Sequence, residues 1–291
     1  MNHAAVAMQR TIAGPLTIPG VGLFTCKKTE VTFLPAPTQH GIVFEIRGER
    51  GESLRIPANT AYAASPHQCT VLGSEGFSVM TIEHLMAALY GLGITNLLVC
   101  ARSPEIPHLD GCSQTFVDQF LKIGLVDQDT AAPVLAVDRR LTIEAANGSA
   151  VLTPHHCLEI TYRIDFQYQV LKTQEYTFSF TTEAFIEEIA SARTFNFANN
   201  LTEILERRRP TGGDFNTVVV FDEQGPMRTT LRFEDEPVRH KILDALGDLA
   251  LLGKRLHAAV RIERGSHSLH LEMVRVLQRM SDSDHGGSTR A

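Results

Sequence analysis

Length, composition and charge predict a soluble globular protein. The 291 residues are 43% hydrophobic and 21% charged, which are the proportions of a folded globular chain. A net charge of −6 without a dominant basic block argues against non-specific nucleic-acid binding. No segment approaches the roughly 20 apolar residues of a membrane helix, and the N-terminal residues lack the apolar core of a secretory signal.

The cysteines indicate a reducing compartment. The five of them are odd in number and widely spread, and none forms a CxxC pair. We therefore expect neither a disulfide framework nor a structural zinc knuckle. Free thiols and a cytoplasmic location are the expectation that follows.

The first half of the chain predicts strands, then a helix, a strand and a second helix. Short β-rich runs separated by Pro and Gly predict the strands. Thr81 is a candidate cap for the first helix, which runs to about Leu92 and ends at Gly91 and Gly93. The expected ranges are strands at 31–36, 41–48, 53–58 and 95–101 and helices at 81–92 and 115–124.

A polar stretch at 126–133 interrupts this pattern, and we place a domain boundary there. Beyond it the strongest predicted helix opens at Pro237, a favoured first-turn position. Residues 281–291 have the composition of a disordered tail. The expected ranges are strands at 134–145, 149–154, 158–166, 175–182, 218–221 and 257–263 and helices at 182–191, 199–208, 237–252 and 267–280.

Both halves therefore share one order of elements, which is several strands, a helix, a strand and a helix. In each half the first strong helix carries a histidine near its start, in TIEHLMAALYGLG and in PVRHKILDALGDLALLG. This faint repeat predicts an α+β protein of two similar domains, at residues 1–126 and 133–280, with helices packed on sheets.

The helix over 237–252 carries a polar stripe. His240, Asp244 and Asp248 are spaced four residues apart and occupy one face about 80° wide. A solvated helix face is the ordinary explanation, but such faces usually carry Lys and Glu, and this helix is apolar on most other sides. A buried carboxylate must be paired or metal-bound, and His-x₃-Asp offers a suitable pair of zinc ligands.

Glu83 and His84 open the other strong helix. No charged residue occurs between His84 and Arg102, which predicts a buried helix. One of the pair could hold a metal while the other faces a neighbouring water. The alternative is a glutamate that complements the helix dipole beside a core histidine. His267 follows a predicted strand at the start of the last helix, where a surface histidine is the ordinary interpretation.

An apolar insertion at about 196–215 follows the sequence SARTF. Phe195, Phe197 and Leu201 lie outside any predicted strand. Beside a metal site, such a segment could line a groove for an aliphatic chain. A small satellite core under a long loop is the competing interpretation.

Taken together, these motifs resemble one family, the zinc-dependent UDP-3-O-acyl-N-acetylglucosamine deacetylases of lipid A synthesis. TIEHL, ARTF and HKILDALGDL in that order form a specific combination. Further matching stretches between residues 9 and 275 are QRTIAGPLTIPGVGLF, LPAPTQHGIVF, EIPHLDGCSQTFV and GSHSL. The resemblance implies two domains, each with a sheet and two helices, and helices packed between the two sheets.

The resemblance also implies catalytic roles. His84, His240 and Asp244 are the implied Zn²⁺ ligands, with a fourth position left open. Glu83 is the implied general base. His267 matches a protonated imidazole that stabilises the oxyanion and protonates the leaving amine, and Asp248 is expected to orient it.

The implied substrate is a UDP-linked acylated amino sugar, from which acetate is removed. Thr194 matches a position that polarises the carbonyl, and Lys241 matches a contact to phosphate or sugar. Phe195 corresponds to the acyl-chain passage, and Leu23 is an expected substrate contact. We expect a monomer with no nucleic-acid partner and no integral membrane association.

The chain departs from the family pattern at positions that bear on substrate binding. Phe24 stands where the pattern GVGLH has histidine, Gly265-Ser266 replaces Ser-Gly, and Asp214 replaces a small polar residue. Two alternatives therefore stay open. One is a paralogue that deacetylates another nucleotide sugar, and the other is a non-catalytic protein that binds a nucleotide sugar or lipid precursor.

Overall fold

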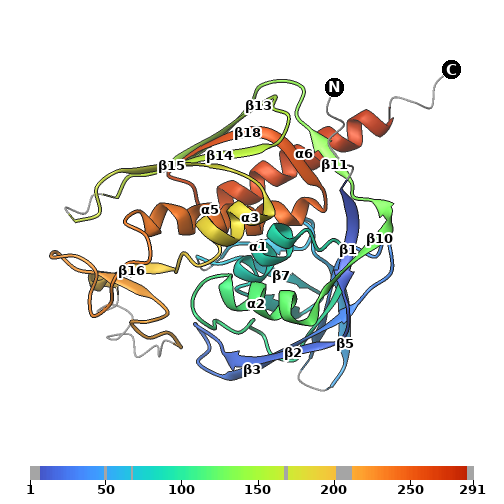
Figure 1. Ribbon diagram of the computed structural model, residues 1–291, viewed down its shortest axis with the longest axis horizontal. Coiled ribbons are helices and arrows are strands. Elements are labelled where there is room, and N and C mark those ends of the chain that lie inside the picture. Colours follow the sequence, from blue (N-terminus) through green and yellow to red (C-terminus); the bar gives the residue numbers. More distant parts are fainter. Residues whose placement is uncertain (1–6, 49–50, 67, 167–169, 201–211, 287–291) are drawn as a thin grey trace.

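The computed structural model describes residues 7–286 apart from 49–50, 67, 167–169 and 201–211. Two sheets lie at opposite sides of the molecule, and the main helices lie between them (Figure 1). This is the α+β arrangement expected from the sequence. The helix expected at 199–208 falls mostly outside the described residues.

The N-terminal sheet has five strands. Its central strand, β9, comes last in the chain. It lies between β3 and β4 and runs parallel to β4. Buried and partly exposed side chains alternate along β3, as in a sheet with one covered face. In spatial order the strands are β2 (Leu16–Val21), β3 (Lys28–Pro35), β9 (Leu97–Ala101), β4 (Ile42–Arg47) and β5 (Ser53–Pro57).

The C-terminal sheet repeats this topology. Its last strand in the chain, β18, inserts between β13 and β14 and runs parallel to β14, while a short strand, β11 (Val134–Ala136), also pairs with β18. The faint sequence repeat thus corresponds to a repeated strand order. In spatial order the strands are β12 (Leu141–Ala145), β13 (Gly148–Thr153), β18 (Arg255–Glu263), β14 (Leu158–Ile164) and β15 (Gln174–Ser179).

Smaller elements complete the described chain. The polar segment at the expected domain boundary forms strand β10 (Leu125–Ala131), which pairs antiparallel with β1 (Met8–Ile12). A three-stranded sheet precedes the first helix, and it consists of β6 (Ala63–Ala64), β7 (Val71–Ser74) and β8 (Phe77–Met80). Contrary to expectation, Phe195 and Phe197 lie in a strand, β16 (Phe195–Phe197), which pairs with β17 (Val219–Phe221).

The helices match the expected ranges with two corrections. The helices are α1 (Glu83–Leu92), α2 (Gln114–Ile123), α3 (Thr182–Ala184) with the π-helical turn Phe185–Ile189, α5 (Glu236–Leu249) with the 3₁₀ turn Ala250–Leu252, and α6 (His267–Gly286). Thr81 does not cap α1, because its backbone is left-handed (φ +61°) and its hydroxyl donates to Glu105 instead. The expected tail is helical as far as Gly286, and Ser281 within it is buried.

Helices α1 and α5 cross in close contact at the centre of the molecule. Gly247 permits this approach, because a Cβ added there would lie 2.1 Å from the carbonyl oxygen of Glu83. Every residue of α1 except Tyr90 is buried, as the charge-free sequence predicts. The crossing brings the first turn of α1 against the polar stripe of α5.

Candidate metal centre and active site

The polar stripe of α5 is buried. His240 and Asp244 are each 3% exposed and Asp248 is 0% exposed, so the interpretation as a solvated helix face is wrong. Three polar side chains removed from water must be satisfied by partners or by a ligand.

His84, His240 and Asp244 converge at the helix crossing. The Nε2 atoms of His84 and His240 lie 3.7 Å and 3.4 Å from Oδ1 of Asp244. The two rings meet edge to face with centroids 5.0 Å apart, and the three potential ligand atoms lie within 4.8 Å of one another. Ligands bonded to one ion at about 2.1 Å lie about 3.4 Å apart in tetrahedral geometry, which is close to the observed separations.

Neighbouring groups orient these side chains. Nδ1 of His240 donates to the carbonyl oxygen of Ala192 at 2.9 Å, which leaves the Nε2 lone pair directed toward Asp244. Lys241 donates from Nζ to Oδ2 of Asp244 at 2.7 Å, and Oδ1 of the same carboxylate faces the two histidines. Ser113 donates to the carbonyl oxygen of His84 and fixes the first turn of α1. The donor set and its orientation fit a divalent metal ion.

The charge states are those that metal ligands need. Burial lowers the pKa of His84 well below its usual value, and the nearby His240 lowers it further. Burial also lowers the pKa of His240. Burial alone would raise the pKa of Asp244, but Lys241 and the surrounding histidines hold it well below the usual range. Two neutral imidazoles therefore face one carboxylate, as metal binding requires.

Glu83 lies beside this triad in a buried position, 4% exposed. Its Oε2 accepts a hydrogen bond of 3.0 Å from the backbone N–H of Thr70. Burial raises the pKa of Glu83 to about 7; the charge of His267 opposes this shift and the carboxylate of Asp244 adds to it. Such a carboxyl group is suited to accepting and releasing a proton near neutral pH.

A second buried cluster follows one turn further along α5. Asp248 accepts hydrogen bonds at Oδ2 from Nδ1 of His267 at 2.7 Å and from Nδ1 of His270 at 2.9 Å. Nε2 of His267 faces the triad, 3.9 Å from Oδ2 of Asp244. On the far side, Tyr162 contacts Nε2 of His270 at 3.1 Å. His267 thus connects Asp248 with the triad of His84, His240 and Asp244.

The two histidines of this cluster differ in charge. Burial alone would lower the pKa of His267, but the carboxylates of Asp248 and Asp244 raise it to about 9. Burial lowers the pKa of His270, and Asp248 only partly offsets this decrease. Burial alone would raise the pKa of Asp248, but His267 and His270 hold it at about 2. An ionised Asp248 therefore supports a protonated His267 and a neutral His270.

Sequence reasoning missed Thr70, which links the two clusters. Its hydroxyl donates to Oδ1 of Asp248 at 2.6 Å, and its backbone N–H donates to Glu83. It also missed His270, although His267 and His270 are three residues apart and share a face of α6. Thr70 has no such signal, because it lies in a loop just before β7.

The expected substrate contact Phe195 lies near the triad. The ring of Phe195 lies 6.3 Å from that of His240. Around Phe195 the structure brings together three more aromatic rings, those of Phe166, Phe197 and Phe221. The backbone of Thr194 donates to Gly111 and accepts from Val219, next to this aromatic cluster.

The expected contact Leu23 and two departures from the family pattern, Phe24 and Asp214, lie on two neighbouring loops. Leu23 accepts a hydrogen bond of 2.7 Å from the backbone N–H of Gly212. Asp214 closes its own turn by accepting from the backbone of Asn216 and Thr217, which lowers its pKa. Phe24 is 43% exposed.

Gly265 is explained by packing. A Cβ added at this position would lie 2.3 Å from the hydroxyl oxygen of Tyr162. Glycine therefore lets Tyr162 reach His270 at the start of α6. The following Ser266 accepts from the backbone of Leu269 and caps that helix.

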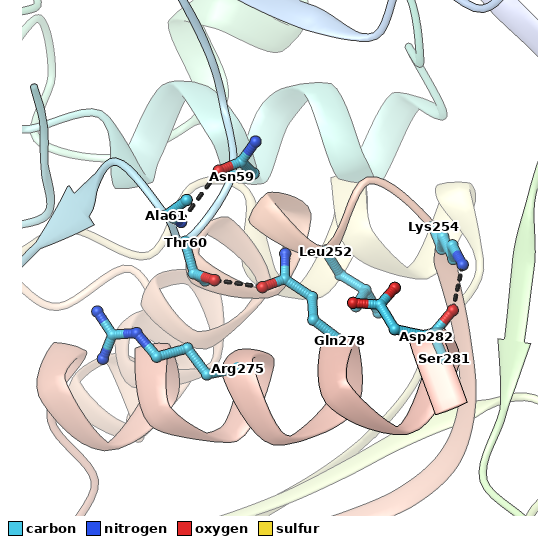
Figure 2. Close-up of a pocket in the computed structure, with 9 residues that line it drawn as sticks. All are labelled: Asn59, Thr60, Ala61, Leu252, Lys254, Arg275, Gln278, Ser281 and Asp282. Atoms are coloured by element: carbon cyan, nitrogen blue, oxygen red, sulfur yellow. Dashed lines mark hydrogen bonds between the residues drawn. The ribbon is translucent and has the colours of Figure 1, made fainter. Parts of the chain in front are cut away.

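Two other features lie apart from this site. A cavity of about 440 Å³ lies near the C-terminal half of α6, about 16 Å along the helix from His267. Figure 2 shows Thr60 bonded to Gln278 and Lys254 bonded to Ser281 around it. A histidine–cysteine group at 155–157 lies in the turn between β13 and β14 and is only partly buried.

Comparison with known proteins identifies the family. The family model for UDP-3-O-acyl N-acetylglycosamine deacetylase matches residues 9–279. The chain belongs to this family. Proteins named UDP-3-O-acyl-N-acetylglucosamine deacetylase from Thermodesulfovibrio yellowstonii and Syntrophotalea carbinolica are 33% and 37% identical to it, over 92% and 91% of this chain and 91% and 86% of theirs. The Chromohalobacter salexigens protein of the same name is 34% identical over 94% of this chain and 91% of its own.

The deacetylase family match spans every expected site residue, from Leu23 to His267. It therefore includes both helices that cross at the triad and the loops that face it. Among the helices that the structure describes, none is both long and apolar enough to span a membrane. All five cysteines are free.

Proposed function

We propose that the chain is a zinc-dependent amidohydrolase that removes acetate from the 2-acetamido group of UDP-3-O-acyl-N-acetylglucosamine in lipid A biosynthesis. The observation that carries the proposal is the convergence of His84, His240 and Asp244 from two helices far apart in sequence. Relatives that carry this activity in their names support the substrate. Free cysteines fit a cytoplasmic enzyme.

His84, His240 and Asp244 are the groups that would hold the zinc ion. When bound there, Zn²⁺ would lower the pKa of water to about 7 and polarise the amide carbonyl. In this proposal the ion lies between units 1–126 and 133–280, each of which supplies ligands. Lys241 holds Asp244 in its ionised form, and we assign it a second contact to substrate phosphate or sugar.

Glu83 acts as the general base. It sits one residue before the ligand His84, and its Oε2 is fixed by Thr70. From there the carboxylate accepts a proton from the attacking water. Placing a positioned base within reach of its proton typically contributes about 10²–10⁴-fold to a rate.

His267 stabilises the oxyanion and donates a proton to the leaving amine. Its Nε2 faces the triad, while its Nδ1 is held by Asp248. The carboxylate fixes the ring orientation and favours the charged imidazole. Thr194, which precedes Phe195 in the chain, would help to polarise the carbonyl.

The aromatic cluster of Phe166, Phe195, Phe197 and Phe221 forms part of the passage for the acyl chain. It lies against His240, so an apolar chain seated there would keep the sugar next to the ligands. We assign Leu23, on the loop that bonds Gly212, a further contact to the substrate. A paralogue with another nucleotide-sugar substrate would keep the same chemistry and change only these contacts.

A non-catalytic binding protein is less well supported than an enzyme. Binding alone would not need Glu83 next to a ligand, nor a buried Asp248 that keeps His267 charged. Burying these groups costs free energy unless they are satisfied, and the cost is explained if they transfer protons.

An acetate-release assay tests the proposed function. Purified protein should release acetate from UDP-3-O-acyl-N-acetylglucosamine. Acetate release should stop after treatment with a chelator and should resume on addition of Zn²⁺. Equal turnover of the sugar without its acyl chain would favour the paralogue. No acetate release from any acylated or acyl-free UDP-sugar, by metal-loaded protein, would refute the enzyme.

A further inference from the structure

His108 is a buried imidazole without a hydrogen-bond partner among the described residues. It is 3% exposed, and neither Nδ1 nor Nε2 is satisfied. Oδ1 of Asp110, two residues later, is also unsatisfied. Buried polar side chains almost always have partners, so each exception needs an explanation. None of the roles assigned above uses His108.

The loop that carries His108 does not depend on the imidazole. The backbone N–H of His108 donates to Val21 at 2.9 Å, and its carbonyl accepts from Gly111 at 3.0 Å. Leu109 and Gly111 take left-handed backbone conformations that complete the turn. Backbone hydrogen bonds and turn geometry therefore hold the loop, and both ring nitrogens of His108 remain available to a ligand.

The ring faces the border of the candidate site. A Cβ added at Gly213 would lie 3.4 Å from Nε2 of His108 and 3.1 Å from Cδ1 of Leu23. The same loop reaches the site through Gly111, whose carbonyl accepts from Thr194 at 2.8 Å. Gly213 therefore lies close to both His108 and Leu23, an expected substrate contact.

The charges around His108 indicate which kind of ligand could bind there. Burial lowers the pKa of His108 to about 4, although the carboxylates of Glu105 and Asp110 oppose the shift. A neutral imidazole offers one donor and one acceptor. Asp214 adds a third carboxylate to this neighbourhood, which disfavours a phosphate and favours a neutral group. A hydroxyl both donates and accepts, so it matches the ring.

We propose that His108 is a substrate-binding residue that hydrogen-bonds a hydroxyl of the substrate's sugar ring. The proposal rests on the proposed function, because it takes its ligand from the same UDP-linked sugar.

Steady-state kinetics of His108→Leu and His108→Gln test this assignment. Leucine removes both polar atoms, whereas glutamine keeps a donor and an acceptor. We expect His108→Leu to raise KM for UDP-3-O-acyl-N-acetylglucosamine by about tenfold, the effect of one lost hydrogen bond to a buried group. The value of kcat and the zinc content should stay near those of the unmodified protein. His108→Gln should recover most of the affinity.

Deoxy-sugar substrates separate a direct contact from a structural effect. With the 4-deoxy or the 6-deoxy substrate, whichever lacks the partner hydroxyl, His108→Leu should no longer raise KM. An unchanged KM for His108→Leu on the full substrate would overturn the proposal. So would an equal rise in KM for both deoxy substrates and the full one. Absence of turnover in the unmodified protein would instead refute the proposed function.

Discussion

Two buried clusters of the same composition lie one turn apart on α5. His84, His240 and Asp244 form the first, and Asp248, His267 and His270 form the second. In the first, histidine nitrogens approach the carboxylate at 3.4 Å and 3.7 Å, too far for good hydrogen bonds. In the second they approach at 2.7 Å and 2.9 Å, within hydrogen-bonding distance.

The difference arises from the neighbours of each ring. The backbone of Ala192 accepts the Nδ1 hydrogen of His240, so its other nitrogen presents a lone pair to Asp244. In the second cluster both Nδ1 hydrogens are directed at Asp248, which also accepts from Thr70. A carboxylate that accepts hydrogen bonds from imidazole N–H groups stabilises a positive charge on an imidazole. A carboxylate that faces the lone pairs of two imidazole nitrogens can instead bind a metal ion together with them. Residue types alone would not distinguish the two.

The largest effect on turnover should come from Glu83→Gln, which leaves both clusters in place. The amide oxygen of glutamine can still accept from Thr70, so the fold and the zinc content should not change. Loss of the base should lower kcat by about 10²–10⁴-fold. Metal analysis beside steady-state kinetics checks both parts. A variant that keeps zinc and full turnover would remove Glu83 from the mechanism.

A smaller effect is expected from Thr70→Val, which disturbs only the second cluster. The change removes the hydroxyl that donates to Asp248 and keeps the backbone bond to Glu83. We expect kcat to fall about tenfold, since one buried hydrogen bond to a charged group is lost. Zinc content should be unchanged.

Thr60→Val is a matched control for this experiment. Thr60 also donates from a buried position to a side chain, Gln278, but at the separate cavity of Figure 2. It should leave kcat unaltered. Equal losses in the two variants would show that Thr70 matters only for folding.

The sequence predicted most of the helices and the shared face of the polar residues on α5 for clear physical reasons. The charge-free run after His84 predicted a buried helix, and the four-residue spacing of His240, Asp244 and Asp248 predicted their shared face. The burial of that face depends on the crossing with α1. Gly247 permits this crossing by its close approach to Glu83, which is 164 residues earlier in the chain. Periodicity within one helix carries no information about such a contact.

The errors share one physical cause, which is contact with residues distant in the chain. Thr81 has the composition of a helix cap, but a left-handed backbone turns its side chain toward Glu105. The polar residues after Met280 suggested disorder, yet Ser281 is bonded to Lys254 and the helix continues. Tertiary contacts decided the local structure in both places.

Metal content is the most direct test of the proposed roles, in which His84, His240 and Asp244 bind the metal ion and the second cluster does not. Purified protein should hold about one zinc ion per chain. His270→Ala, which alters the second cluster, should keep it, and His84→Ala, which alters the first, should lose it. Full zinc retention in His84→Ala, or loss in His270→Ala alone, would contradict the assignment.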